Sequence, residues 1–165
     1  MDSIFNELIV TLDQELDIYK EIFSTSTEKT AVIVDGKVSE LEKIVQAEQK
    51  LIIKITQIEN QREIIIYKMS KALKMKTDEI NLTKLIEMTD GPLKDKLLER
   101  QEGLNKLICG LKELNDLNSK LIRNSLDYIN FSLNLFADAG SQDNNYGIDG
   151  EKSSVKSESR FDFKI

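Results

Sequence analysis

Apolar residues recur along most of the chain at spacings of three, four and seven, which places them on one side of an α-helix. The first such stretch begins at Ile4 and is expected to reach about Val34. Asp35 and Gly36 then supply a break, because glycine tolerates the left-handed backbone that ends many helices. We therefore expect a tight helical hairpin at Asp35-Gly36.

A second periodic stretch runs from about Val38 to Lys74. Its Ile64-Ile65-Ile66 run is β-branched and locally favours a strand. The surrounding helical periodicity extends for about ten turns, however, and no partner strand is in sight. The sequence therefore predicts a helix throughout.

The connector that follows holds signals for a short helix. Thr77-Asp78-Glu79 or Asn81 can cap it, and it is expected to end at about Met88. Asp90-Gly91-Pro92 then begins a long helix, since proline at a first-turn position loses no helical hydrogen bond. The apolar pattern carries this helix to about Phe136.

Helices of this length cannot bury their apolar stripes alone, and the short connectors favour antiparallel neighbours. We therefore predict an all-α protein. The expected fold is an elongated antiparallel bundle of three long helices and one short helix, with residues 1–136 as one domain.

The composition changes after Phe136. Ala137 to Ile165 is poor in apolar residues and rich in Gly, Ser, Asn and Asp, so it is expected to form a flexible tail. Its aromatic residues stand out in two short segments, Tyr146-Gly147-Ile148-Asp149-Gly150 and Arg160 to Lys164. Short segments on a flexible tail suit weak, reversible docking.

Charge and composition remove several classes of function. The net charge of −6, with Lys and Glu interspersed, argues against a nucleic-acid-binding protein. Cys109 is the single cysteine, so it can form no internal disulfide and is expected to be a small core residue. No stretch approaches the roughly 18 apolar residues of a membrane span, so we expect no stable membrane insertion and a cytoplasmic location.

Catalysis is not expected. The chain has no histidine, which is the commonest general base and metal ligand, and it has no glycine-rich phosphate loop. Gly103 and Gly110 lie inside a helical stripe and are expected to allow close packing or a bend. We predict a protein that is not an enzyme and holds neither a metal nor another cofactor.

Four polar residues fall where an apolar residue is expected within the helical stripes: Glu15, Glu48, Arg62 and Asn118. One interpretation is that they pair or reach solvent and fix the alignment of the helices. The other is that they line a functional groove.

The segment from Leu121 to Phe136 carries apolar residues on more than one side of its helix, although a surface helix needs only one apolar stripe. Either other helices enclose this segment in a core, or part of it is an exposed surface for a partner's amphipathic helix. The pattern alone does not choose between these alternatives.

Over nearly its whole length the chain resembles the FlgN-type flagellar export chaperones. The resemblance rests on the order of several separated features and on the tail. In the first half these are Leu12, Glu15, Tyr19, Lys29, Asp35-Gly36, Leu41, Glu48, Glu59 and Arg62; near the other end they are Ser125-Leu126, Ile129, Tyr146-Gly147-x-Asp149-Gly150, Phe161-Asp162 and Lys164.

The resemblance implies a cytoplasmic chaperone that holds the hook-filament junction proteins, FlgK and FlgL, before their export through the flagellar type III apparatus. Its C-terminal region would receive the amphipathic helix of such a client. The residues expected to bind the client are Leu121, Ile122, Leu126, Ile129, Leu133 and Phe136; those expected to dock on the cytoplasmic domain of the export gate are Tyr146, Gly147, Asp149 and Gly150. The competing hypothesis is a coiled-coil scaffolding or adaptor protein that self-associates.

Overall fold

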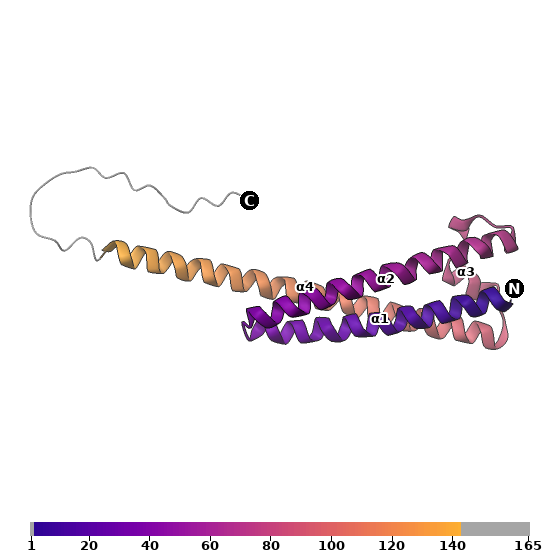
Figure 1. Ribbon diagram of the computed structural model, residues 1–165, viewed down its shortest axis with the longest axis horizontal. Coiled ribbons are helices and arrows are strands. Elements are labelled where there is room, and N and C mark those ends of the chain that lie inside the picture. The colour runs from indigo at the N-terminus through magenta and orange to yellow at the C-terminus, as the bar shows by residue number, and fades with distance from the viewer. Residues whose placement is uncertain (1, 143–165) are drawn as a thin grey trace, which may run out of the picture. The chain divides into compact units, whose positions relative to one another are not determined.

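The computed structural model of the chain describes residues 2–142. It consists of helix α1 (Asp2–Val34), helix α2 (Val38–Leu73), the 3₁₀ turn η1 (Thr77–Glu79), the short helix α3 (Leu82–Glu87) and helix α4 (Gly91–Gln142) (Figure 1). No strand is present among these residues, so the all-α prediction is confirmed, including a helix through the Ile64-Ile65-Ile66 run.

The chain divides into two units. The first is Met1–Ser125, which contains α1, α2, α3 and most of α4. The second is Leu126–Ile165, of which the structure describes the C-terminal part of α4 up to Gln142.

The breaks between helices follow the local sequence signals. Gly36 adopts φ +67°, and the backbone N–H of Lys37 donates to the carbonyl of Val32, which closes the predicted hairpin. Asn81 caps α3, because its side chain accepts a hydrogen bond from the backbone N–H of Lys84 at 2.8 Å. Pro92 occupies the first turn of α4 as predicted.

The first unit is an up-down-up arrangement of its long helices. The α1 residues that pair with α2 meet lower-numbered partners as their own numbers rise, from Glu7 with Lys68 to Lys29 with Glu48, so these two helices are antiparallel. The α1 residues that contact α4 meet higher-numbered partners instead, from Asp13 with Arg100 to Thr30 with Asn118. Helices α1 and α4 are therefore parallel to each other, and both are antiparallel to α2.

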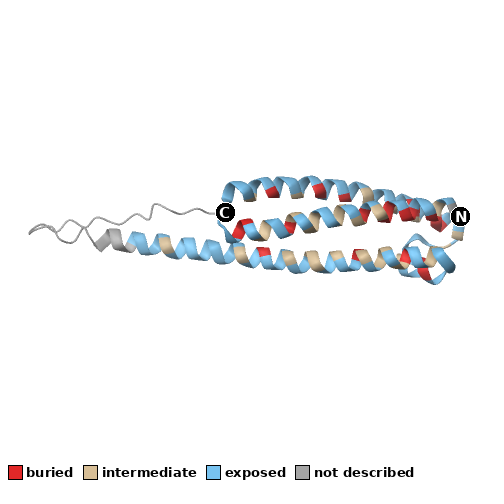
Figure 2. Ribbon diagram, turned by 90° about the horizontal axis from the view of Figure 1, so that it is seen from below, coloured by how far each residue is buried: buried red, intermediate tan, exposed pale blue. Residues whose placement is uncertain are grey.

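The main apolar core of the first unit gathers where α1 begins, α2 ends, and α3 and α4 meet them. Buried residues lie along the facing sides of the helices (Figure 2). The members of this core are Phe5, Leu8, Ile9, Leu12, Ile65, Met69, Ile80, Leu85, Ile86, Leu97 and Leu104. The short helix α3 thus covers one end of the unit.

Two glycines allow α4 to approach α1 closely. A Cβ atom on Gly110 would lie 2.8 Å from Cε2 of Phe23, and one on Gly103 would lie 3.0 Å from Cδ2 of Leu16. Real side chains do not fit at such separations without a shift of the neighbour. The prediction that these glycines serve close packing is therefore confirmed.

Two details differ from the sequence-based expectation. Helix α4 continues to Gln142 instead of ending near Phe136, because Ala137 and Ala139 favour a helix even where the composition has already become polar. Cys109 is exposed and is not a core residue, because the buried side of α4 passes through Leu104 and Asn118.

Candidate functional site

The four polar residues within the helical stripes bind partners across helix boundaries. Glu15 on α1 is 2% exposed, and its Oε1 lies 2.9 Å from Nε of Arg62 on α2. The N–H of Arg62 is not aligned with that oxygen, so the contact is an ion pair without a hydrogen bond. Burial raises the pKa of Glu15 above 4.5; the Arg62 charge opposes this rise and the neighbouring Glu59 carboxylate adds to it.

Tyr19 extends this contact along the hairpin. Its hydroxyl donates a hydrogen bond to Oε1 of Glu59 on α2 at 3.2 Å. Burial raises the pKa of Tyr19, and the Glu59 carboxylate raises it further, so the hydroxyl stays protonated as a donor. Tyr19 therefore serves as a structural link between α1 and α2.

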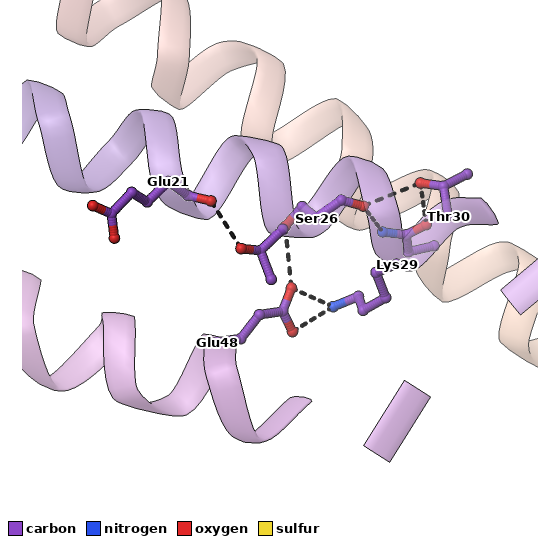
Figure 3. A network of polar contacts seen from close by, with 7 residues as sticks. Glu21, Ser26, Lys29, Thr30 and Glu48 are labelled. Carbon is purple, nitrogen blue, oxygen red and sulfur yellow. Dashed lines mark hydrogen bonds and ion pairs between the residues drawn. The ribbon is translucent and has the colours of Figure 1, made fainter. Parts of the chain in front are cut away.

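A second polar cluster lies nearer the Asp35-Gly36 turn (Figure 3). Nζ of Lys29 donates to both carboxylate oxygens of Glu48, at 2.9 and 2.8 Å, and the hydroxyl of Ser26 donates to Glu48 Oε1 at 3.1 Å. The Lys29 and Glu48 side chains are only 12% and 16% exposed. Because both oxygens of the carboxylate are used, this largely buried pair has little capacity left for an external ligand.

Asn118 joins α4 to the same region of α1. Its side chain is 1% exposed, and its Nδ2 donates to the backbone carbonyl of Ser26 at 3.0 Å. Its Oδ1 accepts a hydrogen bond from the hydroxyl of Thr30 at 2.7 Å. The interpretation that Glu15, Glu48, Arg62 and Asn118 pair across helices is therefore confirmed.

The first unit also contains surface hollows beside these contacts. One of about 830 Å³ lies between α1 and α2 and includes the exposed residues Val10 and Ile64. Another, of about 510 Å³, lies between Leu8, Leu12 and the connector around Ile80. The charged residues that line them are Glu7 and Lys68 in the first hollow, and Arg62 and Glu63 in the second.

Among residues 2–142 no three His, Cys, Asp or Glu side chains are close enough to hold a metal ion. Within the same range, none of the helices has the length and apolar content of a membrane span.

The residues predicted to bind a client lie along α4. In the first unit, Leu121 is half-buried and Ile122 is 37% exposed. In the second unit the exposed fractions are larger: Leu126 55%, Ile129 51%, Leu133 60% and Phe136 75%. We call these four residues of the second unit stripe A.

Stripe A lies on one side of α4, since its members are separated by three, four and three residues. It is exposed in this structure, so the alternative of an enclosed core is not the one observed (Figure 2). The surrounding surface is poor in charge, because Asp127 is the only residue between Arg123 and Asp138 that is charged at neutral pH. An uncharged apolar surface of this kind is typical of a protein-binding site.

Three further apolar residues of this segment were not among those predicted to bind a client. Tyr128, Phe131 and Leu135 are 72%, 61% and 54% exposed. Their spacing of three and four would have identified them, but they lie on a different side of the helix from stripe A. We call them stripe B. The predicted gate-docking residues Tyr146, Gly147, Asp149 and Gly150 lie outside the described residues.

Comparison with known proteins finds one family and one relative that match most of the chain. The family model described as FlgN protein matches residues 1–154. The chain is also 30% identical over 118 residues to the uncharacterized protein YvyG of Bacillus subtilis (strain 168), in an alignment that covers 72% of this chain and 71% of YvyG. No solved structure matches the chain.

Proposed function

Because the chain belongs to the FlgN family of flagellar export chaperones, we propose that it binds hook-filament junction proteins of the FlgK and FlgL type in the cytoplasm. It keeps these clients from associating before export and delivers them to the export gate. The observation that best supports this proposal is stripe A, an exposed apolar surface on a helix that has few charges around it.

Stripe A suits the apolar side of an amphipathic client helix. Burying apolar surface contributes about 25 cal/mol per Å², and full burial of one Leu, Ile or Phe side chain contributes roughly 1.5–3 kcal/mol. Four such residues offset part of the cost of ordering and associating two chains. Leu121 and Ile122, the two residues of the first unit that are expected to bind the client, are also partly exposed.

An apolar contact on stripe A would let the client be released without nucleotide hydrolysis. An apolar contact of modest size is reversible, so the client can dissociate at the gate without nucleotide hydrolysis. The polar contacts of the first unit join α1 to α2 and α4, so these polar side chains are engaged within the fold.

The test is co-expression of the full chain with the FlgK- and FlgL-like proteins of the same genome, followed by size-exclusion chromatography with light scattering. A soluble complex of defined mass supports the proposal and identifies the client. Unbound clients beside the free chain would reject it. A homo-oligomer formed by the chain alone would favour the alternative of a self-associating coiled-coil scaffold.

Docking on the export gate is proposed for Tyr146, Gly147, Asp149 and Gly150 on the strength of the family resemblance. We expect Tyr146→Ala to weaken binding to the cytoplasmic domain of the gate and to leave client affinity nearly unchanged, because the substitution lies outside stripe A. Titration of the gate domain into the chain measures this directly. An unchanged gate affinity would reject the assignment of Tyr146.

A further inference from the structure

Stripe B gives the second unit an additional apolar surface that the proposed client helix on stripe A does not use. Successive residues of an α-helix are rotated by roughly 100° about its axis. On this basis the middle of stripe B lies roughly 140° around the helix from the middle of stripe A. One partner helix packed on stripe A therefore leaves Tyr128, Phe131 and Leu135 exposed.

The charge distribution restricts the occupant of stripe B. No lysine or arginine lies between Arg123 and the end of α4 at Gln142. An anionic membrane surface or a nucleic acid would require basic residues beside the apolar ones. The chemistry favours the apolar side of another protein helix, to which Tyr128 also offers a hydroxyl at the edge of the contact.

The area of stripe B limits which protein helix can occupy it. An aromatic side chain buries 150–250 Å² when fully enclosed, and the three residues are already partly covered, so stripe B offers on the order of 300–400 Å². A stable complex needs about 800 Å² per partner. Stripe B alone is therefore too small to hold a second copy of the chain or an independent partner. Stripe A, whose four residues have similar exposed fractions, also falls short of this area alone.

A client that is already held on stripe A does not face this limit. Its second helix would be present at an effective concentration of roughly millimolar, and a small apolar contact then adds substantially to affinity. We propose that a single client occupies both stripes with two helical segments, so that the C-terminal part of α4 lies between them. This inference rests on the proposed function and specifies its partner as a two-helix client terminus.

The test compares two ligands on the full chain by isothermal titration calorimetry. One ligand is the intact hook-filament junction protein that forms the complex described above. The other is a synthetic peptide that contains only one of its terminal amphipathic helices. The stripe B variant is Tyr128→Ala/Phe131→Ala/Leu135→Ala. Alanine favours helix formation, so the variant should keep its helix, which circular dichroism verifies. The matched control is Ile53→Ala/Ile64→Ala on α2, whose side chains are 60% and 58% exposed.

We expect the stripe B variant to lose at least about 10-fold in affinity for the intact client and to bind the single-helix peptide as the wild type does. The control should change neither affinity. If the stripe B variant binds the intact client as tightly as the wild type, the two-helix arrangement is wrong although the proposed function stands. If light scattering finds a dimer of the free chain that the variant abolishes, a second copy occupies stripe B instead. A wild-type chain that binds no client rejects the proposed function itself.

Discussion

The Nε atom of Arg62 on α2 lies 2.9 Å from Oε1 of Glu15 on α1, and Glu15 is 2% exposed whereas the Arg62 side chain is 39% exposed. The buried member of this pair bears most of the desolvation cost, and its partner stays partly hydrated. Attraction between them does not fully offset that cost, since the pKa of Glu15 remains above its ordinary value.

This pKa shift makes stability depend on pH. An acid whose pKa is raised in the folded state binds its proton more tightly there than in the unfolded chain. Its favourable contribution is therefore complete below pH 4.5 and declines as pH rises from 4.5 through the raised pKa of the folded state. We expect Glu15→Gln to remove this decline, so that the variant gains stability relative to the wild type across that window. Urea unfolding at a series of pH values measures the difference, and a constant difference would contradict the assignment.

The Lys29–Glu48 pair should be costly to break from one side. Lys29→Met leaves the Glu48 carboxylate largely buried with only the Ser26 hydroxyl as donor, and we expect a loss of roughly 2–4 kcal/mol in the free energy of unfolding. The double variant Lys29→Met/Glu48→Leu should recover most of that loss. The matched control is Lys20→Met, whose pair with Asp17 is exposed and should contribute less than about 1 kcal/mol. Equal losses for Lys29→Met and Lys20→Met would contradict the expectation.

Two substitutions of Asn118 should have different effects on the stability of the protein. After Asn118→Leu the Thr30 hydroxyl still has the Ser26 carbonyl as an acceptor at 3.2 Å, so no buried group loses its last partner. We expect the stability of Asn118→Leu to stay within about 1 kcal/mol of the wild type or to rise. Asn118→Asp places a charge at a position that is 1% exposed and should destabilise by about 3 kcal/mol or more at neutral pH. Thermal melts of both variants test this contrast, and a larger loss for leucine than for aspartate would overturn it.

Substitutions in stripe A should weaken client binding without unfolding the protein. We expect Leu126→Gln/Ile129→Gln to reduce client affinity by about 100-fold or more, because the two residues sit at the centre of the proposed contact. Helicity and melting temperature should stay close to those of the wild type, since both side chains are more than half exposed. Pull-down of the client together with circular dichroism tests both statements. Loss of the fold would show instead that these residues belong to a core.

The helices could be predicted from sequence because local signals fix their ends. Asp35-Gly36 and Asn81 act through backbone conformation and capping, which depend on a few adjacent residues. The pairing of Glu48 with Lys29, or of Asn118 with Thr30, depends on how helices distant in the sequence align, and helical periodicity marks such residues only as polar positions on a buried side. The exposure of the segment after Ser125 could not be predicted either, because it depends on whether helices distant in the sequence pack against that segment.

The composition of the buried layer also changes along the first unit. The core where α3 covers the long helices is apolar and includes Leu8, Met69 and Leu97, which are 0–1% exposed. Toward the Asp35-Gly36 turn, the helices are held by fewer apolar residues together with the contacts of Lys29, Glu48 and Asn118. Backbone amides near the turn should therefore exchange with deuterium earlier than those near α3. The hairpin would open from its turn while its other end, with the start of α4, stays folded.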